Sequence, residues 1–135
     1  MFRRPILASV LPAAMALAAL ALPAFADEPG PGGSKPPQPK NGEEVYVMMC
    51  QSCHMAGGKG AVGAAAFPAH ANNPRLGTAA NPIYIVENGK GGMPWFRDTL
   101  TPAQVAQVVG YLRTHFGNNF PEPVTTAEVE AMRKR

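Results

Sequence analysis

The sequence predicts an all-α domain of three to five short helices, followed by a short C-terminal helix. Two segments begin with helix-capping patterns, and the second continues as an apolar stripe at helical spacing. A stretch rich in Gly, Ala, Pro and Asn joins them, with no alternation of strands and helices. The motif Cys50-Gln51-Ser52-Cys53-His54 lies at the end of the first segment, and we expect the helices to pack around it.

The motif predicts covalent attachment of one haem. The thiols of Cys50 and Cys53, the only cysteines, can each add to a haem vinyl group, and His54 is then held beneath the iron as an axial ligand. A redox dithiol is an alternative, expected beside alternating strands and helices. Half of a zinc site is another, but zinc needs four ligands, and neither His70 nor His115 has a neighbouring Cys or His at ligand spacing. We therefore expect haem c with its iron, wrapped by the helices.

Residues 1–26 have the pattern of a Sec-type secretory signal peptide. Arg3 and Arg4 precede an apolar run, and small residues before Ala26 suit signal peptidase. We expect cleavage after Ala26 and a periplasmic protein. An uncleaved anchor is the alternative, because the run is nearly long enough to span a bilayer, and only then would we expect membrane contact.

The rest of the chain divides into a leader and a domain. Residues 27–40 are Pro/Gly-rich, have no large apolar side chain to bury, and predict a flexible leader. Residues 41–135 form one small domain with a C-terminal extension from about residue 118. A domain of this size has difficulty building a sufficient core, and a haem would supply the missing apolar centre.

After cleavage the chain is nearly neutral, so it lacks the strong positive charge that attracts acidic partners such as nucleic acid. The full chain has 12 Lys+Arg and 9 Asp+Glu, and cleavage after Ala26 leaves 10 basic against 9 acidic side chains. This balance gives no basis for nucleic-acid binding. Lys59, Lys90 and Arg97 are expected near the haem edge, where they could steer an acidic redox partner. Ordinary solvated charges are the simpler explanation of these three residues.

The first helix is predicted over residues 42–50. Asn41 is a suitable N-cap, and acidic residues follow it in the first turn, where they oppose the helix dipole. Spacings of four, four and three place Gly42, Tyr46, Cys50 and Cys53 on one face.

The last long helix is predicted from Thr101 to Gly117. Thr101 and Gln104 form a capping box, with proline at the first helical position. The apolar stripe packs on the first helix, and glycine at position 42 permits close approach of the two backbones. The stripe consists of Val105, Val108, Val109, Leu112 and Phe116.

A short helix over 82–87, capped by Asn81 and ended by Asn88-Gly89, precedes the loop that carries Met93. Glycines give this loop unusual backbone freedom, and Pro94 fixes the turn after Met93. A lone methionine often fills core space, but this setting favours a sixth iron ligand. Near the C-terminus, Thr125 and Glu128 form a second capping box, which predicts the final helix.

These features together resemble a class I bacterial cytochrome c with one His/Met-ligated haem, over about residues 41–117. The resemblance implies the cytochrome c fold, in which Gly42 and Tyr46 cross the terminal helix at Val108 and Tyr111. It also implies that His54 and Met93 are the axial ligands. The residues that carry it are Gly42, Tyr46, Cys50 to His54, Gly91-Gly92-Met93-Pro94 and Tyr111.

The resemblance assigns a further role to Pro68, whose carbonyl is expected to accept the other ring N–H of His54. The chain departs from many relatives just after this proline. It has Ala69-His70-Ala71-Asn72 where they have an apolar pair and glycine. His70 could compete for the iron, but we interpret it as a loop histidine near the haem edge.

The implied function is outer-sphere electron transfer rather than catalysis. We expect no enzyme activity, because no acid/base or nucleophilic constellation accompanies the motif. Residues 116–125 are similar to tails of cytochrome subunits of periplasmic dehydrogenases, so the expected partners are a dehydrogenase donor and a respiratory acceptor. One alternative is a haem enzyme or a gas- or peroxide-binding protein with an open iron site. Another is a structural subunit whose haem only stabilises its fold.

Overall fold

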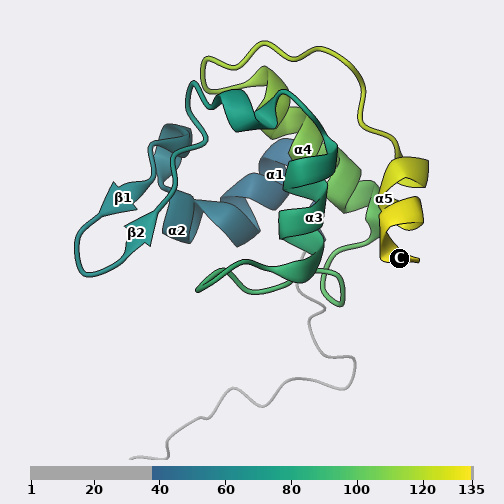
Figure 1. Ribbon diagram of the computed structural model, residues 1–135, viewed down its shortest axis with the longest axis horizontal. Coiled ribbons are helices and arrows are strands. Elements are labelled where there is room, and N and C mark those ends of the chain that lie inside the picture. Colours follow the sequence, from purple (N-terminus) through teal and green to yellow (C-terminus); the bar gives the residue numbers. More distant parts are fainter. Residues whose placement is uncertain (1–37, 135) are drawn as a thin grey trace, which may run out of the picture. The chain divides into compact units, whose positions relative to one another are not determined.

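The computed structural model describes residues 38–134 (Figure 1). By its contacts the chain divides into two units, and the second, Pro36–Arg135, contains every described residue. The signal peptide expected at 1–26 and most of the leader expected at 27–40 lie outside the described residues. Within residues 38–134, no helix has both the length and the apolar character needed to cross a membrane.

The described unit is mostly helical, as predicted. Its α-helices are α1 (Gly42–Val45), α2 (Gln51–His54), α3 (Ala80–Asn88), α4 (Pro102–Thr114) and α5 (Thr126–Arg133). A π-helical turn, Tyr46–Cys50, joins α1 to α2, and single 3-10 turns lie at Ala56–Gly58 and Pro74–Leu76. One antiparallel hairpin pairs β1 (Ala61–Val62) with β2 (Ala66–Phe67).

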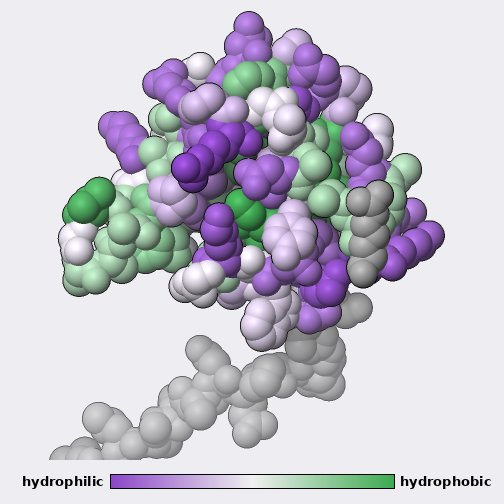
Figure 2. All heavy atoms as spheres, viewed as in Figure 1, coloured by the Kyte–Doolittle hydropathy of each residue, from purple (hydrophilic) through white to green (hydrophobic). Residues whose placement is uncertain are grey.

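The β1–β2 hairpin departs from the all-α prediction. Its register pairs Ala61 with Phe67 and Val62 with Ala66. Each strand has two residues and no alternation of polar and apolar side chains, so the sequence carries no period-2 signal for it. Val62 is 97% exposed, and the hairpin projects as the apolar lobe at the left of Figure 2.

Helix α1 begins as its sequence predicts. The side-chain oxygen of Asn41 accepts a hydrogen bond of 2.8 Å from the Glu44 amide. Glu43 and Glu44 lie in the first turn, where their charges oppose the helix dipole.

The predicted 42–50 helix continues to His54, but a wide turn interrupts it. In the π-helical turn Tyr46–Cys50 each hydrogen bond spans one residue more than in an α-helix. Along this segment Gly42 and Tyr46 are buried, Cys50 is half-buried and Cys53 is exposed.

Helix α4 crosses α1 at glycine, as predicted. A Cβ on Gly42 would overlap the backbone carbonyl of Gln107 and lie 2.8 Å from the Tyr111 Cβ. Glycine therefore lets the two backbones touch. The Tyr46 and Tyr111 rings pack beside this crossing with their centroids 5.9 Å apart.

Both predicted features of the α4 N-terminus are present, but the helix ends earlier than predicted. Thr101 and Gln104 form the capping box, with proline at the first position. The helix stops at Thr114 instead of Gly117, because the C-cap His115 is extended, and Phe116 then takes a left-handed φ of 57°. That turn brings its ring centroid to 5.0 Å from that of Tyr46.

Helix α3 begins before its predicted cap. Its first residue is Ala80 and its N-cap is Ala79, which makes no side-chain capping bond. Asn81 therefore lies inside the first turn and is not the cap. The helix ends at Asn88, where Gly89 leaves helical geometry with a φ of 73°.

Helix α5 packs beside α4 and α3 (Figure 1). The predicted capping box of Thr125 and Glu128 is present, and Val129 is 0% exposed. The C-terminal extension therefore contributes to the same core as the rest of the domain. The buried apolar residues are Val45, Tyr46, Leu76, Ile83, Val86, Leu100, Val105, Ala106, Val108, Val109, Leu112 and Val129.

Candidate functional site

His54 ends α2 and is buried. Its Nδ1 atom lies 2.9 Å from the carbonyl oxygen of Pro68, fourteen residues further along the chain. A carbonyl oxygen only accepts hydrogen bonds, so Nδ1 carries a proton and Nε2 is the ring nitrogen that can offer a lone pair. No hydrogen bond within residues 38–134 uses Nε2. His54 is therefore oriented and still has one nitrogen available to bind iron.

Tyr46 fixes the backbone just after His54. Its buried hydroxyl donates a hydrogen bond of 2.7 Å to the carbonyl of Met55. Met55 has a φ of 64°, an unusual backbone conformation for a residue with a side chain. Burial raises the pKa of Tyr46, so the phenol stays protonated and keeps donating. The sequence predicted that Tyr46 points inward, but not this bond.

Cys50 and Cys53 are both free thiols. Cys50 packs against the apolar core, while Cys53 is exposed at the surface. Burial, followed by the neighbouring Cys53, raises the pKa of Cys50 to about 11. Reactive redox cysteines have a lowered pKa, so this environment argues against the dithiol interpretation.

A zinc site also lacks support in the described part of the chain. Residues 38–134 contain no group of three or more His, Cys, Asp or Glu side chains placed to hold a metal ion. A structural zinc ion requires four protein ligands. The thiols are therefore best explained by covalent attachment to a group that brings its own metal.

His70 lies against the face of the His54 ring. The two ring centroids are 4.1 Å apart, with an angle of 35° between the planes. His70 therefore packs on the face of the ring that would bind iron through Nε2, and its interpretation as a loop histidine near the haem edge stays a prediction.

Burial, followed by the proximity of His54, lowers the pKa of His70 to about 4. The backbone around His70 is also well held, since its amide donates to Gly58 at 2.7 Å and its carbonyl accepts from Asn118 at 2.8 Å. His70 therefore remains neutral near pH 7 and fills space beside the His54 ring.

The loop that carries Met93 is closed by backbone hydrogen bonds. Lys90 and Met93 pair in both directions, at 3.1 and 3.0 Å. A Cβ on Gly89 would come within 3.0 Å of the Pro94 backbone, so this close approach depends on glycine. Met93 is half-buried against the apolar core. No hydrogen bond or ring contact among residues 38–134 joins Met93 to His54, and their shared binding of one iron stays a prediction.

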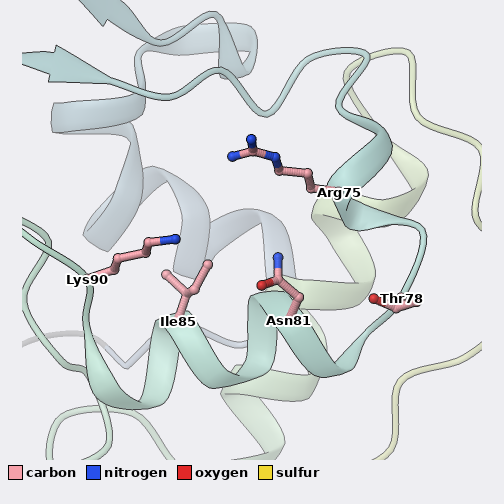
Figure 3. Close-up of a pocket in the computed structure, with 5 residues that line it drawn as sticks. All are labelled: Arg75, Thr78, Asn81, Ile85 and Lys90. Atoms are coloured by element: carbon pink, nitrogen blue, oxygen red, sulfur yellow. The ribbon is translucent and has the colours of Figure 1, made fainter.

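A cavity of about 420 Å³ lies over α3. Figure 3 shows Arg75 and Lys90 reaching over it from opposite sides, with Asn81 and Ile85 rising from α3 between them. Its volume is in the range of cofactor pockets. The two charged lining residues are both basic, so the cavity favours an anionic ligand group.

The sequence-based reasoning missed Arg75, Thr78 and Asn81 as site residues. One signal was present, because Arg75 is the only Lys, Arg, Asp or Glu between residues 60 and 86. Asn81 was misinterpreted as a helix cap. Lys90 was predicted near the haem edge, and it lines this cavity.

Comparison with known proteins gives matches over most of the described unit. Residues 37–112 match the family profile described as cytochrome c oxidase, cbb3-type, subunit III. The chain is 35% identical over 106 residues to the alcohol dehydrogenase (quinone) cytochrome c subunit of Gluconacetobacter polyoxogenes, which covers 68% of this chain and 22% of that protein. The corresponding subunit of Gluconobacter oxydans is 30% identical over 105 residues. The chain therefore spans about a fifth of the length of these subunits.

Smaller proteins match over more of their length. Cytochrome c6 of Nostoc sp. is 38% identical over 74 residues, covering 53% of this chain and 66% of that protein. Cytochrome c6 of Gloeothece citriformis is 34% identical over 93 residues, covering 67% of this chain and 74% of that protein. The region that matches the family profile, residues 37–112, includes the motif Cys50 to His54.

Proposed function

Because the chain belongs to the cytochrome c family whose profile covers residues 37–112, we propose that it is a periplasmic carrier of single electrons from a dehydrogenase to the respiratory chain. The resemblance to class I c-type cytochromes is confirmed, and the protein is an electron-transfer protein that binds haem c covalently. The observation that carries the proposal is the orientation of His54, with Nδ1 bonded to Pro68 at 2.9 Å.

The residues of the site fit a covalent haem. Cys50 and Cys53 are unpaired thiols at the spacing required for two thioethers. His54 offers Nε2 as one axial ligand, and we assign Met93 as the other. The two haem propionates are anionic, and we assign Arg75 to them because charge-assisted hydrogen bonds to carboxylates are strong. Lys90 lines the same cavity and would add a second positive charge.

When bound, haem supplies a one-electron iron couple whose potential is raised by histidine and methionine ligation. Hydrogen bonds within the chain fix the orientation of the His54 ring and of the backbone beside it. The Pro68 carbonyl fixes the tautomer of His54 and raises the basicity of Nε2. Tyr46 fixes the Met55 carbonyl beside it. None of these groups has to exchange a proton or a partner, which suits electron transfer with little rearrangement.

The ligation is tested by carbon monoxide binding to the ferrous protein. We expect the wild type to resist carbon monoxide because Met93 occupies the sixth position, and Met93→Ala to bind it. Met49→Ala is the matched control, since Met49 is also half-buried against the core. If the wild type binds carbon monoxide as readily as Met93→Ala, the open-site alternative is correct and the carrier proposal fails.

The donor is proposed from the relatives that are named as cytochrome c subunits of a quinone-dependent alcohol dehydrogenase. Stopped-flow mixing with such a dehydrogenase and its alcohol should reduce the haem within the turnover time of the enzyme. Reduction that is much slower than turnover would contradict this donor. It would also favour the alternative in which the haem only stabilises the fold.

The compartment is proposed from residues 1–26. The haem-containing protein recovered from an exporting host should begin at Asp27, as read by N-terminal sequencing. A chain that retains residues 1–26 would contradict cleavage and support the membrane-anchor alternative.

A further inference from the structure

A buried carboxylate of α3 is bound by the last helix of the chain. Glu87 is 1% exposed, and Arg133 of α5 contacts both of its oxygens, with Nε to Oε2 at 2.7 Å and Nη2 to Oε1 at 2.9 Å. Two parallel hydrogen bonds between a guanidinium and a carboxylate form a strong and directional pair. Arg97 is the other cation near Glu87, at 3.9 Å, and it is more exposed than Arg133.

Arg133 also reaches a second segment. Its Nη2 atom donates a hydrogen bond of 2.8 Å to the carbonyl oxygen of Leu100. Glu87 is the residue just before the segment 88–99, which we call the Met93 loop, and Leu100 is the residue just after that segment. A single guanidinium therefore joins the two ends of the loop that carries Met93.

Several backbone hydrogen bonds hold the loop. The Phe96 amide donates to the Val86 carbonyl at 2.9 Å, Lys90 pairs with Met93, and the Phe96 carbonyl accepts from the amides of Thr99 and Leu100. Met93 and Phe96 pack against the apolar core, whereas most other loop residues are exposed. The loop therefore has few buried side-chain contacts, and the bonds of Arg133 to Glu87 and Leu100, which we call the Arg133 pin, add to them.

Helix α5 has other attachments, so it does not depend on Arg133 alone. Val129 is completely buried in the core, and Val124 and Met132 pack against the same cluster. The segment before α5 is held by Arg113, which pairs with Glu122 at 2.9 Å. Substituting Arg133 therefore removes the pin without freeing the helix.

We propose that Arg133 is a positioning residue for Met93: by binding Glu87 and the Leu100 carbonyl it closes the ligand loop and keeps the methionine on the iron. This rests on the proposed ligation by Met93. Removing Arg133 leaves the Glu87 carboxylate buried without its main partner, which favours open forms of the loop. The iron should then exchange Met93 for an external ligand more often, although Arg133 does not contact the haem site itself.

The test uses the full-length ferric holoprotein and added imidazole. The rate of methionine replacement is followed by loss of the methionine-to-iron charge-transfer band, and global stability is measured in parallel by guanidinium unfolding. We expect Arg133→Ala to accelerate replacement about tenfold or more. Arg133→Lys should give an intermediate rate, because lysine keeps the charge but loses the two-pronged geometry.

Two control variants distinguish a specific effect of Arg133 on the Met93 loop from a general loss of stability. Arg97→Ala removes the weaker cation near Glu87, and Glu122→Gln weakens the other attachment of the tail. We expect both to leave the replacement rate within about twofold of the wild type, since surface charges usually contribute little.

The outcomes distinguish this inference from the ligation on which it rests. A wild type without the charge-transfer band overturns both. A wild type with the band, combined with equal rates in Arg133→Ala and Glu122→Gln, overturns only the pin. Amide hydrogen exchange gives a second readout that needs no added ligand. Exchange in residues 88–99 should accelerate in Arg133→Ala while α4 stays protected, and equal acceleration in both regions would also overturn the pin.

Discussion

At the scale of single residues, each group around the motif has one clear task. Pro68 contributes only its carbonyl, which fixes the proton of His54 on Nδ1. Tyr46 contributes its hydroxyl, which holds the Met55 carbonyl in a backbone conformation that non-glycine residues rarely adopt. His70 contributes its ring face, packed against His54. These tasks are structural, and all of them leave Nε2 of His54 free for iron.

The Tyr46 bond is tested by Tyr46→Phe, which removes the hydroxyl and keeps the ring. The Met55 carbonyl loses the hydroxyl donor and keeps only the Gly58 amide, so we expect the free energy of unfolding to fall by about 1–2 kcal/mol, measured in guanidinium. Tyr84→Phe is the matched control, because Tyr84 is 58% exposed, and it should change stability by less than about 0.5 kcal/mol. Equal effects of the two substitutions would show that the bond contributes nothing.

At the scale of elements, the features that the sequence predicted correctly are local. The caps at Asn41, Thr101 and Thr125 each depend on residues three positions apart, so they can be recognised without knowing the fold. The end of α4 was predicted wrongly: the backbone becomes extended at His115, and the Phe116 ring then packs on Tyr46, seventy residues away in the sequence.

Two other elements also lacked a local signal. The π-helical turn at Tyr46–Cys50 has an ordinary helical composition, and the β1–β2 hairpin has strands too short to show a period. In the site, the motif and the Met93 loop were visible in the sequence. The cavity residues and the pin between Glu87 and Arg133 were not, because they meet only when distant segments pack.

The close crossing of α1 and α4 is tested by substituting alanine for two glycines, one at the crossing and one away from it. Gly42→Ala places a methyl group against the Gln107 carbonyl, so we expect a loss of about 1–3 kcal/mol in unfolding free energy. Gly110→Ala, in α4, meets no atom within 4 Å and should stabilise the protein by about 0.5–1 kcal/mol through its helix propensity. Thermal unfolding by circular dichroism measures both, and a neutral Gly42→Ala would contradict the close crossing.

The cap of α5 gives a prediction on pH. The Thr125 amide and hydroxyl donate to Glu128, and these bonds lower the pKa of Glu128 from 4.5. A lowered pKa in the folded state means that the charged cap stabilises α5 above about pH 4.5, and that this contribution is lost as the pH falls through the lower folded pKa. Amide NMR signals of α5 should report fraying on acidification. In Glu128→Gln, which has no charge to lose, a fraying of the same size would contradict the assignment.

At the scale of the whole molecule, helices from both ends of the described chain share one small apolar core. The core is drawn from α1, α3, α4 and α5 and the turns between them, and α5 belongs to it through Val129. The near-neutral charge expected after cleavage of residues 1–26 gives no general attraction to nucleic acid. The family assignment identifies the covalently bound group as haem c.

The dependence of the fold on haem is tested by Cys50→Ala with Cys53→Ala, which prevents covalent attachment. Without the macrocycle in place we expect the free energy of unfolding to fall by on the order of 3–5 kcal/mol, as for the loss of a large buried side chain. Circular dichroism and guanidinium unfolding of the purified chain measure it. Unchanged stability would mean that the protein part is sufficient by itself, against our account of the small core.

The central claim is that His54 and Met93 close the two axial positions of one haem iron, so that the protein transfers electrons without binding a substrate. The absorption and electron paramagnetic resonance spectra of the wild-type ferric protein test it most directly. We predict a low-spin iron with the methionine-to-iron charge-transfer band, and loss of that band in Met93→Ala. A wild-type spectrum that shows high-spin iron and no such band would contradict the claim.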